Sequence, residues 1–87
     1  MKVQNMTSFM GNPVPNQFII DDDNGNRFFQ SYQSIIIKVS DGKTYLDEKL
    51  WNYSITTAKY RNLFLWETTN EVKAKIESGD YILTNLN

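Results

Sequence analysis

The 87-residue chain contains no cysteine and no histidine. Without cysteine there can be no disulfide and no thiolate nucleophile or metal ligand. Without histidine the chain lacks the commonest general base and the commonest metal ligand. These absences exclude serine–histidine–aspartate and cysteine–histidine catalysis and ordinary zinc sites. We therefore predict a protein that is not an enzyme, with no catalytic residue, no metal and no cofactor.

Long apolar runs and a surplus of one charge are also missing. The longest aliphatic run is Ile35–Ile37, far below the ~20 residues that a membrane-spanning helix needs. Nine Lys and Arg residues against ten Asp and Glu residues give a net charge of −1. Non-specific nucleic-acid binding normally requires a basic surplus, which makes nucleic acid the less favoured partner. We expect a cytoplasmic protein without a membrane partner.

Hydrophobic residues make up 40% of the chain and aromatic residues 14%, which is enough for one small core. We predict a single α+β domain over residues 17–87. Residues 1–16 hold both prolines and are predicted to form an irregular N-terminal arm, either docked or free. Three residues of the arm are apolar enough to pack on the core or cover a sheet edge: Phe9, Met10 and Val14.

The first hairpin is predicted around Asn24-Gly25, which lies between two apolar segments. This dipeptide is typical of a type I′ turn because both residues tolerate positive φ. A two-residue turn there pairs Asp22 with Arg27 as an ion pair and brings Ile20 opposite Phe29. In that register Phe18, Ile20 and Phe29 form the core face.

The second hairpin is predicted around Asp41-Gly42 by the same turn chemistry. A two-residue turn pairs Ile37 with Leu46 and Lys38 with Tyr45. The apolar face of this hairpin would consist of Ile35, Ile37, Val39 and Leu46. The opposite face would consist of Ile36, Lys38, Tyr45 and Asp47.

The apolar spacing changes from strand-like to helix-like after residue 53. Ser54 is a candidate N-cap for a helix over residues 55–65. Thr68 and Glu71 form a capping-box pattern that opens a second helix, which ends before Gly79. A last strand is predicted over residues 81–86. The predicted order is ββββααβ: an antiparallel sheet of four to five strands, from two consecutive hairpins and a C-terminal strand, with two short helices on one face.

The tip of the first hairpin is the first candidate binding site. It carries polar and acidic side chains in close succession: Asp21, Asp22, Asp23, Asn24 and Asn26. An EF-hand calcium loop would need Gly at its sixth position and Glu at its twelfth, whereas these positions hold Asn26 and Tyr32. The tip is then a solvated turn, an acidic contact for a basic partner surface or a weak cation site.

Two further sets of residues are candidates. Trp51 and Trp66 border the first predicted helix and can serve either as lids on the core or as binding hot spots. The sheet face away from the helices offers an alternative, a stacking platform for nucleic acid. Its residues would be Arg27, Phe28, Tyr32, Lys38 and Tyr45.

The strings Phe29-Gln30-Ser31-Tyr32 and Thr56-Thr57-Ala58-Lys59-Tyr60 carry a resemblance that runs from about residue 6 to residue 87. The chain resembles a small, uncharacterised protein family of phages and mobile elements of low-GC Gram-positive bacteria. The resemblance implies no catalytic residues. It also implies a small residue, often Gly, where Trp66 stands here.

Short phage accessory proteins often act by binding and blocking one host factor. The resemblance therefore implies a small accessory protein in the host cell interior that blocks a host or defence protein, such as an anti-defence (anti-CRISPR-like) inhibitor. A small nucleic-acid-binding module is the alternative, and a homo-oligomeric phage protein is a third hypothesis. The expected partner-binding residues are the acidic tip, Trp51 and Trp66.

Overall fold

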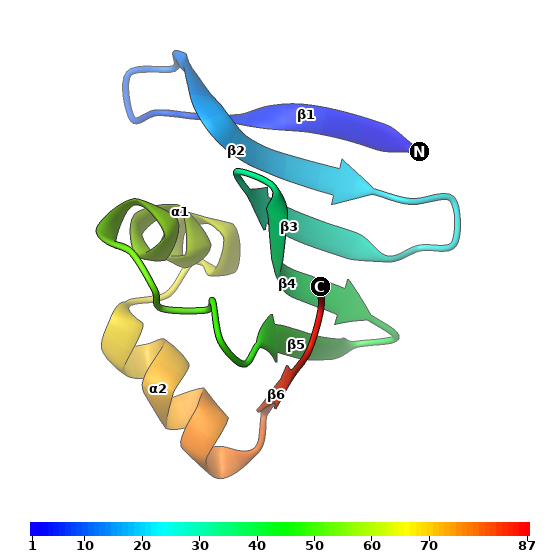
Figure 1. The fold of residues 1–87 in the computed structure, drawn as a ribbon, viewed down its shortest axis with the longest axis vertical. Coiled ribbons are helices and arrows are strands. Elements are labelled where there is room, and N and C mark those ends of the chain that lie inside the picture. The colour runs from blue at the N-terminus through cyan, green and yellow to red at the C-terminus, as the bar shows by residue number, and fades with distance from the viewer.

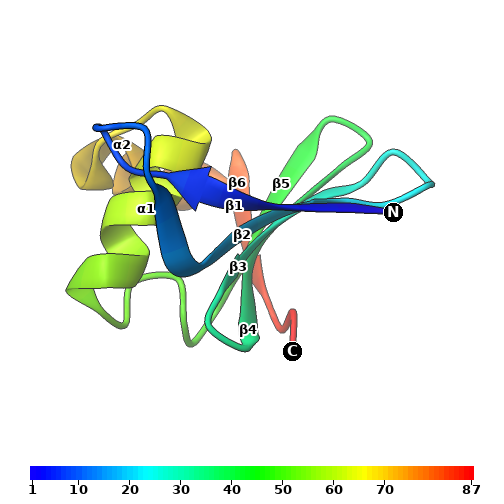
Figure 2. The ribbon, with the colours of Figure 1, turned by 90° about the horizontal axis from the view of Figure 1, so that it is seen from above.

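A computed structural model describes residues 1–87 as one mixed sheet with two helices on one of its faces (Figures 1 and 2). The strands lie side by side in chain order. The first five strands are paired antiparallel to one another in succession, and the sixth is parallel to the fifth. The elements are β1 (Lys2–Thr7), β2 (Pro13–Asp21), β3 (Arg27–Ser31), β4 (Ser34–Ser40), β5 (Lys43–Asp47), α1 (Ile55–Leu65), α2 (Thr69–Ser78) and β6 (Tyr81–Thr84).

The α+β class and the order of strands followed by helices are confirmed, but the predicted sheet was wrong in two respects. It has six strands, not four to five, and it is not wholly antiparallel. β6 lies parallel to β5 because the two helices carry the chain back to the end of the sheet at which β5 begins, and β6 starts there. Neither helix is long and apolar enough to cross a membrane.

The N-terminal arm is not irregular, because residues 1–16 contain β1 and the first part of β2. Pro13 and Pro15 have no backbone amide to donate to a neighbouring strand. They are tolerated because β3 pairs with β2 only from Gln17 onward, so the prolines remove no hydrogen bond between these two strands. β1 places Met6 in the core, a residue that the sequence patterns did not single out. Phe9 and Met10 do not pack on the core and are fully or mostly exposed, whereas Val14 packs against it.

The first hairpin has a different register from the predicted one. Arg27 pairs with Asp21 instead of Asp22, and a five-residue loop, Asp22–Asn26, replaces the two-residue turn. The Asp22 carboxylate causes the difference, since its Oδ1 accepts hydrogen bonds from the amides of Asn24 and Asn26 at 2.8 and 2.9 Å. Only Gly25 in this loop has a positive φ, of 83°.

This one-residue shift exchanges the two faces of the first hairpin. Ile19, not Ile20, lies opposite Phe29 and packs against the core. Phe18 and Ile20 therefore lie on the face away from the helices, contrary to the prediction. The ion pair of Arg27 is with Asp21, at 3.4 Å between partly exposed side chains.

The turn and strand pairing of the second hairpin and the bounds of both helices are as predicted. Ile36, however, was assigned to the face away from the core and is fully buried in it, because a bulge in β4 opposite Phe29 and Gln30 makes it the extra residue of the strand. Asp41 and Gly42 have φ values of 52° and 76°, and the predicted pairing of β4 with β5 is observed throughout. Ser54 caps α1 through its hydroxyl, and the capping box of Thr68 and Glu71 opens α2. The core lies between the sheet and the helices and contains Met6, Phe29, Ile36, Ile37, Leu46, Tyr60 and Val72.

Arg61 is fully buried, although Lys59, two positions earlier on the same helix, is exposed. Its guanidinium donates to the carbonyl of Trp51 at 2.7 Å, to Asn52 Oδ1 at 2.9 Å and to Thr69 Oγ1 at 2.9 Å. It also donates to Asn62 Oδ1. Arg61 thus joins the loop after β5 to the start of α2 without any acidic partner.

Asp47 is also buried, although the sequence assigned it to the face opposite the apolar face of the second hairpin. Its carboxylate accepts hydrogen bonds from the amides of Lys49, Leu50 and Leu86 and from the side chain of Asn87. β6 ends at Thr84, two residues before its predicted end, because the following residues turn to reach Asp47. The C-terminal tail is therefore fixed to the sheet.

A candidate partner-binding groove

Trp66 stands where helix α1 ends. Its backbone is left-handed, with φ 59° and ψ 43°, and its amide closes the helix on the carbonyl of Asn62. Glycine is the usual residue at such a position because a Cβ raises the energy of left-handed backbone by about 1–2 kcal/mol. The side chain is 93% exposed, so little packing within the chain offsets this strain.

Trp66 and the fully exposed Phe9 line the same cavity, which has a volume of about 680 Å³. Phe9 belongs to the loop between β1 and β2, and Trp66 to the corner between α1 and α2. The lining residues are Thr7, Ser8, Phe9, Lys59, Tyr60, Asn62, Leu63, Trp66, Glu67, Thr68 and Glu71. A second cavity, of about 400 Å³, adjoins the first. It shares Thr7, Leu63 and Trp66 with the first and adds Gln4, Asn5, Met6 and Ile19.

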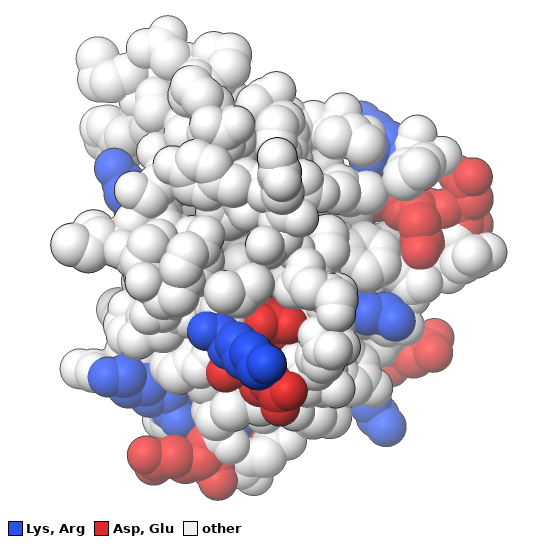
Figure 3. Space-filling view, in the orientation of Figure 1, with Lys and Arg blue, Asp and Glu red and all other residues white.

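We call these two adjoining cavities the Trp66 groove. The groove brings together residues 4–9 of the first strand and loop with residues 59–71 of the helices. The β1–β2 hairpin and α1, which bound it, form a region with few charged atoms on the face shown in Figure 3. Exposed aromatic groups with little charge around them are typical of the centre of protein–protein interfaces.

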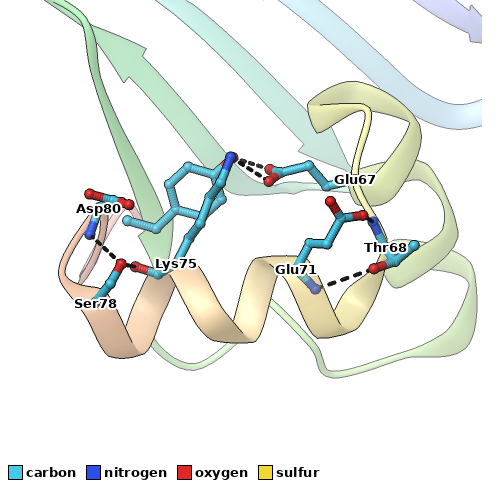
Figure 4. Close-up of polar contacts among 7 residues, drawn as sticks. Glu67, Thr68, Glu71, Lys75, Ser78 and Asp80 are labelled. Carbon is cyan, nitrogen blue, oxygen red and sulfur yellow. Dashed lines mark hydrogen bonds and ion pairs between the residues drawn. The ribbon is translucent and has the colours of Figure 1, made fainter.

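The carboxylate of Glu67, which lines the groove, is neutralised by partners within the chain. The Glu67 side chain is only 7% exposed; it forms an ion pair with Lys75 and accepts a hydrogen bond from the Tyr81 hydroxyl (Figure 4). Burial, together with this hydrogen bond and the Glu67 charge, raises the pKa of Tyr81 to about 12. The contact with Glu67 also raises the pKa of Lys75. Lys75 therefore stays charged and Tyr81 stays neutral at neutral pH, and their contacts with Glu67 support the corner that carries Trp66.

Two other charged residues line the groove, and each contacts a neighbour. Glu71 accepts a hydrogen bond from the amide of Thr68 at 3.0 Å, and hydrogen bonds with Thr68 lower the pKa of Glu71. The ammonium group of Lys59 lies 5.5 Å from the centre of the Tyr60 ring. The groove thus offers the exposed rings of Phe9 and Trp66 for apolar contact, beside charged groups that already have partners in the chain.

The two tryptophans, which the sequence treated alike, occupy different environments. Trp51 is half-buried against the core, and its ring lies 5.2 Å from the guanidinium carbon of Arg61. This position makes Trp51 a packing residue of the loop before α1. Trp66 has no such support and projects into solvent.

The acidic tip lies away from the Trp66 groove, at the opposite end of the sheet (Figures 1 and 3). Each of its three carboxylates has a partner. Asp21 pairs with Arg27, Asp23 pairs with the N-terminal ammonium group, and Asp22 is held by the amides of its own loop. Asn24 is exposed, and Asn26 donates its side-chain amide to Asp22 at 2.9 Å.

The residues of the nucleic-acid alternative are only partly brought together. Phe28, Lys38 and Tyr45 follow one another across three strands, on the sheet face away from the helices. Arg27 points to the other face, where its guanidinium lies 5.8 Å from the Phe64 ring of α1. Tyr32 is half-exposed in the β3–β4 turn. The set of Phe28, Lys38 and Tyr45 therefore contains one cation, Lys38.

The charge of Lys38 acts on Asp22 of the acidic tip. Hydrogen bonds from Asn26 are the main reason for the lowered pKa of Asp22, and the charge of Lys38 adds to this effect. The platform thus has a carboxylate close to its only cation, which weakens attraction for phosphate. Nowhere in the molecule do three acidic side chains gather as a metal site would require.

Comparison with known proteins gives a family but no function. Residues 1–81 match a family of unknown function (DUF8033), and the chain belongs to this family. The expectation of a small uncharacterised family is therefore confirmed. No match was found among curated proteins or among solved structures.

Proposed function

We propose that this protein acts by binding another protein through the Trp66 groove. The observation that carries the proposal is the conformation of Trp66, a large ring in left-handed backbone that is 93% exposed. Intrachain packing does not account for this placement. A binding role does, because tryptophan is enriched among residues whose loss costs an interface at least ~2 kcal/mol.

A blocking role requires only such a surface, without reactive groups. The groove contains no cysteine or histidine, and its carboxylates are held by Lys75, Tyr81 and Thr68. We propose further that the chain is a phage-type accessory protein of the cell interior whose partner is a host or defence protein. An anti-defence (anti-CRISPR-like) role would fit this proposal, and its support is the family resemblance of the sequence.

The acidic tip is proposed as a secondary contact, because it projects from the sheet far from the groove. Its carboxylates would act on the rate of association with a basic surface more than on the lifetime of the complex. The nucleic-acid alternative has weaker support, since Arg27 lies on the opposite face of the sheet from Phe28, Lys38 and Tyr45.

The proposal is tested by capture of partner proteins from a lysate of the encoding cells, using Trp66→Gly and Ile55→Ser as a matched pair. Both positions are exposed apolar residues of the α1 region, at 93% and 91%, but only Trp66 lines the groove. Wild-type protein and Ile55→Ser should capture the same partner, and Trp66→Gly should lose at least about 30-fold in affinity for it.

Trp66→Gly has a second expected effect that separates binding from folding. Relief of the left-handed strain should stabilise the fold by about 1 kcal/mol and raise the melting temperature by roughly 4–8 °C. A variant that is more stable and yet binds less cannot have lost binding by unfolding. Capture of the same partner by Trp66→Gly at unchanged affinity would refute the proposal, as would salt-sensitive retention on heparin as the only detectable binding.

A further inference from the structure

We infer that the Trp66 groove accepts an extended segment of its partner, which adds as a seventh strand to the free edge of β1. This inference rests on the proposed function and specifies the shape of the partner. In strand addition, backbone hydrogen bonds along the edge supply affinity and pockets for alternate side chains supply specificity. Both requirements can be examined in the structure.

The edge itself is open. β1 is the outermost strand, paired only with β2, and no other segment covers it (Figure 2). The backbone amides and carbonyls on the outer side of an edge strand have no strand partner. β1 has no proline, and its single charged side chain, Lys2, lies at its first position. Edge protection by charge is therefore confined to one end of the strand.

The pockets lie beside this edge. The smaller cavity is lined by Gln4–Thr7 of β1 together with Ile19, Leu63 and Trp66. The larger cavity continues from Thr7 past Phe9. Since both cavities include Leu63 and Trp66, the tryptophan stands between them. Side chains on one face of a strand are roughly 7 Å apart, so two apolar residues at positions i and i+2 can occupy the two cavities together.

A helix and a second copy of this chain fit less well. A helix could contact Trp66 but would leave the outer backbone groups of β1 without partners. A second β1 strand would present either Lys2, Gln4 and Met6 or Val3, Asn5 and Thr7. Each set has a single apolar residue, and Met6 is already buried in its own core. The geometry therefore favours a foreign strand with two apolar residues in alternation.

The inference is tested with a phage-displayed library of random octapeptides selected on the immobilised full-length protein. Enriched peptides should carry apolar residues at two positions of the i, i+2 kind. Ile55→Ser should bind them like the wild type, whereas Trp66→Gly should bind them at least about 30-fold more weakly. Hydrogen exchange with the best synthetic peptide bound should show slower exchange of alternate β1 amides.

Three results would overturn the inference. The first is a peptide that binds in a Trp66-dependent way while exchange of the β1 amides is unchanged. The second is the absence of any peptide that distinguishes wild type from Trp66→Gly. The third is a concentration-dependent dimer that protects β1 without peptide, which would make a second copy the occupant. Trp66-dependent capture of a partner with unprotected β1 amides would remove strand addition and leave the proposed function standing.

Discussion

Arg61 gives the sharpest test of how this small domain is held together. The side chain is fully buried and has no carboxylate partner, and burial lowers its pKa. Its charge is instead shared among four acceptors, namely the Trp51 carbonyl, the side-chain amide oxygens of Asn52 and Asn62, and the Thr69 hydroxyl. Removal of the guanidinium therefore leaves the Trp51 carbonyl and Asn62 Oδ1 without a donor from the chain.

The magnitude follows from these contacts. Arg61→Met keeps much of the buried volume but removes the donor of the Trp51 carbonyl and of Asn62 Oδ1. Thr69 Oγ1 keeps the side-chain amide of Asn62 as a donor, and Asn52 is exposed to water. The substitution should destabilise the fold by about 2–4 kcal/mol, because each orphaned buried group costs ~1–3 kcal/mol and part of the loss is offset by the removed buried charge. Arg61→Lys keeps the charge but loses the planar fork, and about 2–3 kcal/mol is expected. For a domain of this size, each kcal/mol corresponds to roughly 4–8 °C in melting temperature.

Urea unfolding followed by tryptophan fluorescence and far-ultraviolet circular dichroism measures these losses. The fluorescence should report directly on the site, since the Trp51 ring lies 5.2 Å from the guanidinium carbon. Lys59→Met is the matched control, an exposed cation two positions earlier on the same helix, with an expected change below about 1 kcal/mol. If Arg61→Met unfolds at the urea midpoint of the wild type, the hydrogen-bond reasoning is wrong.

Three further predictions concern groups whose roles are set by the fold. Burial raises the pKa of Asp47, but the hydrogen bonds that its carboxylate accepts outweigh this effect, so the pKa is lowered overall. Asp47 should therefore add to the free energy of unfolding above its unfolded pKa of about 3.9, and this stability should be lost as the pH falls further. Asp47→Asn should flatten the acid side of the plot of urea stability against pH, and an unaltered plot would contradict this. Gln17 is buried with both side-chain polar atoms unpaired, so Gln17→Met should stabilise the fold by about 1–2 kcal/mol in calorimetry, whereas a loss would point to a hidden partner. Gly25→Val and Gly42→Val should each cost about 1–2 kcal/mol because both positions have positive φ, and unchanged melting temperatures would show otherwise.

The parts of the fold that could be predicted are those set by neighbouring residues. The Ser54 cap, the Thr68 capping box and the Asp41-Gly42 turn each depend on contacts within a few positions, and all three are observed. The first hairpin also depends on neighbouring residues, yet the register predicted for it was wrong. The Asp22 carboxylate offers its own loop two hydrogen bonds, and this competes with the type I′ turn that Asn24-Gly25 favours.

The parts that could not be predicted depend on distant residues. Nothing near Lys2–Thr7 indicates that this polar segment pairs with β2, because the pairing is specified by the partner strand and by the burial of Met6. The burial of Arg61 likewise requires acceptors from two other segments of the chain, residues 51–52 and the start of α2 at Thr69. The groove also depends on distant residues, since Trp66 was a candidate from the sequence whereas Phe9 was expected to pack on the core or cover a sheet edge.

The two rings of the groove are held by ordered backbone, and this bears on what they do. Phe9 lies in a turn closed by hydrogen bonds from the Ser8 amide to the Asn12 carbonyl, at 2.7 Å, and from the Gly11 amide to the Ser8 carbonyl, at 2.9 Å. Trp66 is fixed by the closure of α1 on Asn62. Side chains on ordered backbone lose less conformational entropy when they bind than those on flexible loops, so more of the contact energy appears as affinity. If no partner binds, holding these rings on ordered backbone adds nothing to the stability of the fold. At Trp66 it lowers the stability, because glycine at this position would relieve the left-handed strain. The placement of both rings is therefore not accounted for by the stability of the fold, and it supports the proposed binding of a partner.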